Sequence, residues 1–104
     1  LVSCILKDGT KVNVPIEIKW AKHDKVWIAP KEQILKQYML EQDVSHAIYI
    51  VGWGGIDHLY SRQPGRRKKP ENIKEFQEQL QNYTDSQLDG TGKAITVHVL
   101  DITV

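Results

Sequence analysis

Several residue types and patterns are scarce in this chain of 104 residues, and each scarcity excludes a class of protein. The chain has one cysteine, Cys4, which cannot form an internal disulfide, so we expect a reducing, cytoplasmic setting. No run approaches the roughly 18 consecutive apolar residues that a membrane span needs. The first ten residues, LVSCILKDGT, also lack the basic start and the long apolar run of a signal peptide. We therefore expect a soluble domain that does not contact a membrane.

The overall composition is that of one compact globular domain covering residues 1–104. Apolar residues make up 40% of the chain and charged residues 26%, with a net charge of +1, so disorder and fibrous repeats are excluded. Methionine occurs once, at Met39, and the first residue is Leu1. We therefore expect the domain to be a fragment of a larger protein, the rest of which would be one of its partners.

The hydrophobic periodicity predicts an α/β fold with the order β-β-α-β-α-β. Two extended runs, 2–6 and 11–20, flank Asp8-Gly9 and predict an opening β-hairpin with a two-residue turn. Apolar residues at helical spacing predict a helix over 31–42 and a second helix that starts at Pro70. A continuous apolar run over 47–53 predicts a central strand that is buried on both faces. We expect an exposed loop over 56–69, which contains proline, glycine and basic residues without a regular period, and the last strand over 94–104. Together these elements predict a mixed β-sheet flanked by helices.

The most unusual pattern is Glu17-Ile18-Lys19 near the end of the second extended run. In a strand, Glu17 and Lys19 lie side by side on one face because side chains alternate with a period of two. A carboxylate can hold a hard divalent cation, and an adjacent lysine can position a water molecule or a phosphate oxygen. The same triplet also fits an ordinary charged alternation on a half-exposed strand, so its context decides between the two readings.

That context is a helix that contains Gln33, Gln37 and Tyr38 after the strand. With it, the chain resembles the PD-(D/E)XK nuclease superfamily. The resemblance rests on the order and spacing of short motifs that span nearly the whole chain, and it is closest to a nuclease-like domain at the C-terminal ends of large bacterial multidomain proteins. These motifs are VPIEIKW, KEQILKQYM, HAIYIVGW, GRRKKPENIKEFQEQL and ITVHVLDIT.

The resemblance implies a restriction-endonuclease-like sheet and metal-dependent phosphodiester hydrolysis of DNA, with a possible role in bacterial defence. It implies that Glu17 is a ligand for Mg²⁺ or Mn²⁺ and that Lys19 is the catalytic lysine. Gln33 and, five residues later, Tyr38 would be the helix motif that lines the site. The superfamily also has an aspartate on the strand before the E-x-K, whereas residues 1–7 contain no acidic residue.

The predicted hairpin register indicates where that aspartate belongs. With Asp8-Gly9 as a two-residue turn, the numbers of facing residues sum to 17, so Glu17 would face the residue just before Leu1. We therefore expect either that the aspartate precedes Leu1 or that this member lacks it. Asp8 belongs to the turn and Asp24 to the link after the strand, so both are weak substitutes.

Five basic residues lie within eight positions that contain no acid, and such a cluster suits contacts with DNA phosphates. These residues are Arg62, Arg66, Arg67, Lys68 and Lys69. A solvated loop without a partner is the alternative reading of this cluster. The four histidines are scattered without the spacing of metal ligands, and the three tryptophans are expected in core or edge packing.

Two classes of function therefore remain open. The first is a magnesium-dependent deoxyribonuclease or nuclease-derived domain. The second is a non-catalytic module that keeps the nuclease fold and binds nucleic acid or another part of the parent protein. A purely structural Glu17–Lys19 pair is a third reading.

Overall fold

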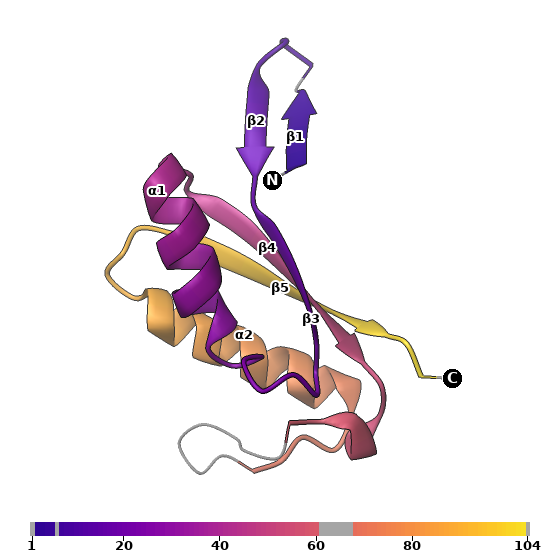
Figure 1. The fold of residues 1–104 in the computed structure, drawn as a ribbon. Helices are drawn as coiled ribbons and strands as arrows, with labels where there is room; N and C mark the ends of the chain where they lie inside the picture. Colours follow the sequence, from indigo (N-terminus) through magenta and orange to yellow (C-terminus); the bar gives the residue numbers. More distant parts are fainter. Residues whose placement is uncertain (1, 6, 61–67, 104) are drawn as a thin grey trace.

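The computed structural model describes residues 2–5, 7–60 and 68–103, and it shows an α/β fold (Figure 1). The element order is β1 (Val2–Ile5), β2 (Lys11–Val14), β3 (Ile16–Trp20), η1 (Pro30–Met39), α1 (Leu40–Gln42), β4 (His46–Trp53), η2 (Ile56–His58), α2 (Ile73–Leu88) and β5 (Ala94–Asp101).

The main sheet has three strands in the order β3-β4-β5, and both pairings are parallel. The prediction of one mixed sheet is therefore wrong. The antiparallel pair β1–β2 forms a separate two-stranded sheet, because the extended run over 11–20 is divided at Pro15. Proline has no N–H to donate, but its carbonyl accepts from the N–H of Ile48 at 2.9 Å. The chain thus leaves the hairpin at Pro15 and joins β4.

The predicted hairpin exists, but its register differs by one residue. Val2 pairs with Val14 and Ile5 with Lys11, so facing residue numbers sum to 16 instead of 17. Glu17 lies on β3, which pairs with β4 in the other sheet, so the prediction that Glu17 faces the residue just before Leu1 is wrong. A two-residue type I′ turn needs a positive φ at both central residues. Here Gly9 has a φ of 87°, but the φ of Asp8 is not positive. Asp8 instead accepts a hydrogen bond from the Thr10 N–H at 2.9 Å, which closes a local turn within a longer loop.

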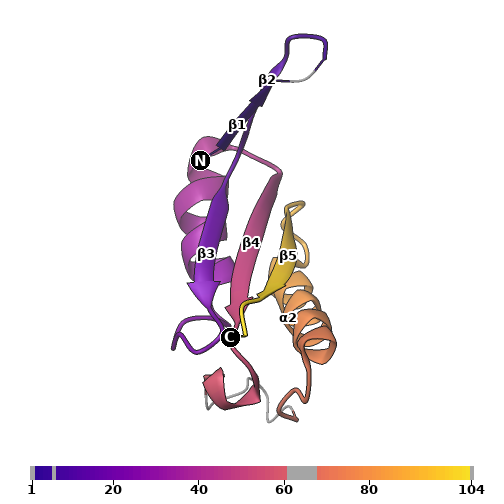
Figure 2. The same ribbon diagram turned by 90° about the vertical axis from the view of Figure 1, so that its right-hand side faces the viewer.

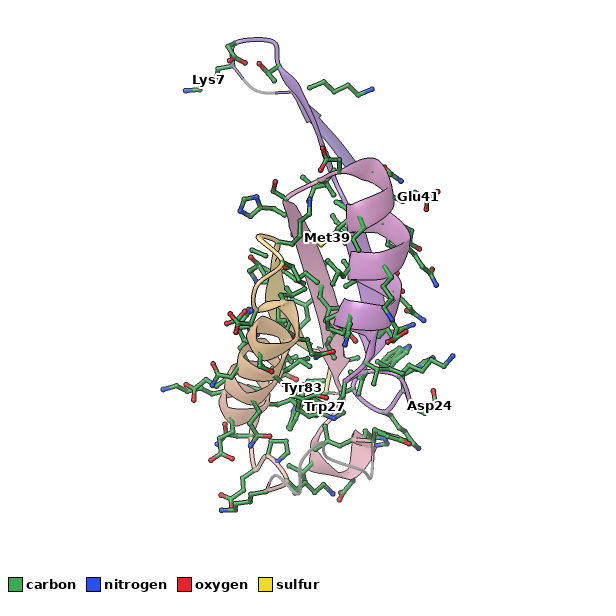
Figure 3. The ribbon with its side chains drawn as sticks, turned by 90° about the vertical axis from the view of Figure 1, so that its left-hand side faces the viewer. Lys7, Asp24, Trp27, Met39, Glu41 and Tyr83 are labelled. Carbon is green, nitrogen blue, oxygen red and sulfur yellow. The ribbon has the colours of Figure 1, made fainter. Side chains whose placement is uncertain are left out.

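Both crossover connections place their helices on the same face of the parallel sheet. Figure 2 shows the strands in front of η1, α1 and α2, and Figure 3, from the opposite side, shows the helices in front of the strands. Three parallel strands in sequence order, joined by right-handed crossovers, give this arrangement. Consequently β4 is buried on one face only, through Ala47, Tyr49, Val51 and Trp53. Its expected burial on both faces is wrong.

The first helix is wider than an α-helix over most of its length. Residues 30–39 form a π-helix, in which the N–H of residue i+5 donates to the carbonyl of residue i, and one α-helical turn follows. Pro30 occupies the first turn, and Glu32 and Lys36 form an exposed ion pair at 3.2 Å. Ile34 and Met39, five residues apart, are both buried against the sheet.

The second helix begins at Ile73, three residues after the predicted start at Pro70. Asn72 caps it, because its side chain accepts a hydrogen bond from the Glu75 N–H at 2.9 Å. The Glu75 carboxylate in turn accepts from the Glu71 N–H at 2.8 Å. The last strand ends at Asp101, three residues before the predicted end.

An aromatic cluster fills the core between α2 and the sheet. Trp27 packs edge to face against Phe76 and Tyr83, with ring centroids 5.8 Å apart in both pairs, and Trp53 lies 5.4 Å from Phe76. The expected core packing is confirmed for Trp27 and Trp53. No helix in the described part of the chain has the length and apolar character needed to cross a membrane.

Candidate functional site

Glu17 and Lys19 form an ion pair on the helix-covered face of β3. The Lys19 Nζ atom lies 3.6 Å from the Glu17 Oε1 atom, and the two side chains are only 11% and 20% exposed, respectively. Period two along Ile16–Trp20 explains the geometry, because it turns both side chains to one face while Ile18 and Trp20 point to the other. The prediction that the two residues lie together on one side of a sheet is confirmed.

The neighbours of the pair are apolar or fully buried. In the parallel register, Glu17 lies beside Tyr49 and Lys19 beside Val51. The Tyr49 hydroxyl donates a hydrogen bond of 2.7 Å to the carbonyl of Val26. Burial, and secondarily the negative charge of Glu17, raise the pKa of Tyr49 far above its ordinary value. Tyr49 therefore stays protonated and cannot serve as a general base.

Gln33 and Tyr38 lie on η1, the helix that covers the same face of the sheet as the ion pair. Both are half-buried, whereas Gln37 is exposed. Successive turns of a π-helix bring residues five apart onto neighbouring turns, so Gln33 and Tyr38 share one side of the helix. Within the described residues, neither side chain forms a hydrogen bond or ion pair with Glu17 or Lys19. The structure thus places Gln33 and Tyr38 on a helix over the same face of the sheet as the pair, without a hydrogen bond or ion pair to it among the described residues.

The basic segment is described only at its end. Arg62, Arg66 and Arg67 lie outside the described residues, so their predicted contact with DNA has no structural account here. Lys68 and Lys69 are exposed before α2, and the Lys68 Nζ atom lies 3.1 Å from Glu71. The Glu71 carboxylate raises the pKa of Lys68, which keeps the ammonium charged.

The described residues supply a single carboxylate at the candidate centre. In residues 2–5, 7–60 and 68–103, no three His, Cys, Asp or Glu side chains are grouped to hold a metal ion. Asp8 caps the hairpin turn, and Asp24 is an exposed residue whose Oδ1 lies 3.1 Å from the Nδ1 of His23. Both are therefore engaged in local turns. The β1 strand contains Cys4, whose side chain lies outside the description.

Two residues near the pair were not singled out by sequence reasoning. Tyr49 lies within the run AIYIVGW, where nothing distinguishes it from a core residue until the register with Glu17 is known. Trp20 was expected in core or edge packing but is 64% exposed, because it points to the face that the helices leave open. An alternation of charged and apolar residues on a strand does not reveal which face will be covered.

In comparisons with family models, curated proteins and solved structures, no match to this chain was found. The resemblance to the nuclease superfamily therefore rests on the sequence motifs alone.

Proposed function

We propose that this domain acts on the phosphodiester backbone of DNA, as a nuclease or nuclease-derived domain of the PD-(D/E)XK type with Glu17 and Lys19 at its centre. One observation carries the proposal: a largely buried ion pair occupies a sheet face whose other positions are apolar. Removing two charges from water costs free energy that their attraction often fails to repay, so stability alone is a weak reason for such a pair.

The chemistry of the pair suits a phosphodiester. The Lys19 ammonium can hold a non-bridging phosphate oxygen and stabilise the negative charge that grows there as water attacks the phosphorus. The Glu17 carboxylate can accept a hydrogen bond from that water and orient it. Gln33 and Tyr38, on the helix over the same face, are proposed to contact the same phosphate or its sugar.

The resemblance implies Mg²⁺ or Mn²⁺ at Glu17, but the described residues do not fit such an ion by themselves. Magnesium prefers an octahedron of oxygen ligands supplied by one or two carboxylates, water and phosphate. Glu17 is the single carboxylate in place, and its near oxygen already faces Lys19. We therefore derive no catalytic step through the ion, and a second acidic ligand would be required.

A restriction-endonuclease-like arrangement is the finer fold that we propose. It is supported by the strand with the E-x-K triplet, the helix that follows it, and the parallel return strand β4. By the same resemblance, the domain would serve within a larger bacterial protein that acts against foreign DNA. The second candidate function is a non-catalytic DNA-binding or interaction module, and the single carboxylate is the observation that favours it.

The first test measures duplex DNA binding in EDTA across a range of salt concentrations. We expect Lys19→Met to lower the log-log salt slope by about 0.9, as expected for one lost phosphate contact, and Glu17→Gln to tighten binding by removing a negative charge. Glu32→Gln and Lys36→Met are the matched controls, because they change the same charges in an exposed pair on η1. Equal effects of Lys19→Met and Lys36→Met would contradict a phosphate contact at Lys19.

The second test is plasmid cleavage with Mg²⁺ or Mn²⁺. We expect the 104-residue chain to cleave poorly, because one carboxylate binds a strongly hydrated dication weakly. Where the gene encodes a second acidic ligand outside residues 1–104, a chain extended to include it should cleave, and Glu17→Gln should abolish that cleavage. DNA binding without cleavage by the extended chain would instead favour the non-catalytic module.

A further inference from the structure

A cavity of about 660 Å³ lies at the carboxyl ends of the three parallel strands, where Trp20 ends β3 and Gly54 follows β4. Ile102, which follows β5, and the residues of η2 also line the cavity. Figure 2 shows the carboxyl ends of the three strands pointing to the end of the sheet near η2. Ligands of open α/β sheets bind outside the carboxyl ends of the strands, and the volume is that of a small-molecule site.

Two apolar side chains of this cavity, Trp20 and Ile102, pack over Gly52. A Cβ atom on Gly52 would lie 2.8 Å from Ile102 Cδ1 and 3.5 Å from Trp20 Cε3, so these two side chains lie together over Gly52. Trp20 is 64% exposed, whereas Trp27 and Trp53 are 4% and 6% exposed. The cavity thus contains a solvent-exposed indole beside an aliphatic side chain. Together these two side chains form an apolar surface on which a planar ring can stack.

The rim of the cavity carries both a cation and polar groups. Lys22, two residues after Trp20, is exposed and has no ion pair among the described residues. His58 lies against Gly54, where a Cβ atom would be 3.2 Å from the His58 Cβ atom, and Asp57 is exposed beside it. An ammonium suits a phosphate, and a carboxylate can accept from an amino or hydroxyl group.

A shallower groove of about 240 Å³ continues from this cavity along the open face of the sheet. It shares Trp20 and Ile102 with the cavity, and Lys19 is among the residues that line it. The groove therefore extends the cavity along the open face of the sheet, whereas the Glu17 and Lys19 side chains lie on the helix-covered face.

We propose that the cavity binds an unpaired nucleotide, with its base stacked on Trp20 and its phosphate at Lys22. The inference rests on the proposed function and names its substrate form: DNA with a single-stranded segment, which continues along the groove on the open face of the sheet. A base within a duplex is already stacked on both sides, so its face cannot reach the indole without unpairing. Base stacking on an exposed aromatic side chain is tolerant of sequence, as expected for a site with so few polar groups.

The test titrates the chain in EDTA with the oligonucleotide dT8, with an abasic oligomer of equal length, and with dTMP. We expect dT8 to quench the emission of the exposed Trp20 and to bind more tightly than the abasic oligomer. Trp20→Leu should abolish the quenching and weaken the binding of labelled dT8 by roughly 5- to 100-fold. Leu40→Ala, which removes an exposed apolar side chain from α1, is the matched control and should change neither.

The phosphate contact is tested with Lys22→Met against Lys25→Met, an exposed lysine in the same turn. We expect only Lys22→Met to weaken dTMP and dT8. Equal binding of dT8 and the abasic oligomer, or unchanged dT8 affinity in Trp20→Leu, would overturn the proposal. Quenching by dTMP at the same concentration as dT8 would support a nucleotide site while overturning a path for a strand.

The outcome is separable from that of the proposed function. Binding in EDTA at Trp20 does not require the Glu17 carboxylate. If dT8 still quenches Trp20 emission while Lys19→Met behaves like Lys36→Met, the proposed role of the Glu17–Lys19 pair is overturned and the nucleotide site is not. Loss of quenching with the Lys19 effect intact would overturn the nucleotide site alone.

Discussion

The hydroxyl of Tyr49 connects the sheet to the turn that follows β3. Tyr49 is fully buried, and the hydrogen bond from its hydroxyl to the Val26 carbonyl fixes this turn to the sheet. The same side chain lies beside Glu17 in the parallel register, so the charged pair rests against a rigid neighbour. Tyr49 thereby couples the position of Glu17 to the packing of Val26.

Tyr49→Phe removes this hydrogen bond and leaves the Val26 carbonyl without a partner. We expect a loss of about 1 to 3 kcal/mol in the free energy of unfolding, measured by urea denaturation. Tyr38→Phe is the control, because the Tyr38 hydroxyl has no hydrogen-bond partner among the described residues, and it should stay within about 0.5 kcal/mol of the parent. Equal stabilities for the two variants would contradict the anchoring role.

The raised pKa of Tyr49 predicts a pH dependence with a definite sign. Above about pH 10 the tyrosine ionises in the unfolded chain but stays protonated in the folded one, so the folded state binds more protons. Stability should fall there by about 1.4 kcal/mol per pH unit from this group, until the folded pKa is reached. Tyr49→Phe should remove that part of the slope while leaving the lysine contribution, and an unchanged slope would contradict the assignment.

At the scale of elements, α2 closes the outer edge of β5 with two glutamines. The Gln81 amide accepts from the Val97 N–H at 2.8 Å and donates to the Ile95 carbonyl at 2.9 Å. One turn earlier, Gln77 accepts from the Val99 N–H at 2.7 Å and donates to the Val97 carbonyl. These amides occupy the places that a neighbouring strand would take.

Removing each glutamine should expose one particular backbone amide. We expect Gln81→Ala to accelerate hydrogen exchange at Val97, and Gln77→Ala at Val99, each with a loss of about 1 to 3 kcal/mol in stability. Glu78→Ala, on the exposed side of α2, is the control and should affect neither amide. Uniform acceleration along β5 in either variant would show that the helix packing, not the amide pair, protects the edge.

Periodicity located most elements but could not assign their partners. The helix predicted over 31–42 appears as η1 and α1, and the strand predicted over 47–53 appears as β4, whereas the single run predicted over 11–20 is divided into β2 and β3. The switch at Pro15 was missed because the local pattern continues through it, and whether β3 pairs with an antiparallel or a parallel neighbour depends on distant residues. The exposure of Trp20 was missed for a related reason, since crossover handedness decides which face the helices cover.

The same limit applies to the candidate site. That Glu17 and Lys19 share a face follows from two-residue alternation alone, and the structure agrees. That their neighbours are Tyr49 and Val51 depends on the β3–β4 register, which the sequence does not state. Spacing within one element could therefore be predicted, whereas contacts between elements could not.

At the scale of the whole molecule, we expect the β1–β2 hairpin and the parallel sheet to differ in stability. Figure 1 shows β1 and β2 extending beyond the end of the main sheet, away from both helices. An isolated two-stranded hairpin is marginally stable in water, whereas β4 lies between two strands under the helices.

We therefore expect the hairpin to open far more often than the main sheet. The amides of Lys11 and Asn13 should exchange with solvent at least about a hundredfold faster than those of Tyr49 and Val51, measured by NMR. The comparison is internal to one sample and needs no variant. Equal protection in the two sheets would mean that the hairpin belongs to the same cooperative unit.

The closed edge of β5 also has a consequence for how copies of this domain can associate. A fibre that grows by strand addition needs two open sheet edges in each copy, because each copy must pair with one neighbour on either side. With Gln77 and Gln81 filling one edge of the main sheet, strand addition to that sheet can proceed through β3 alone. Two copies joined through their β3 edges have no open main-sheet edge left. The glutamines of α2 therefore prevent the main sheet from growing beyond a dimer by strand addition.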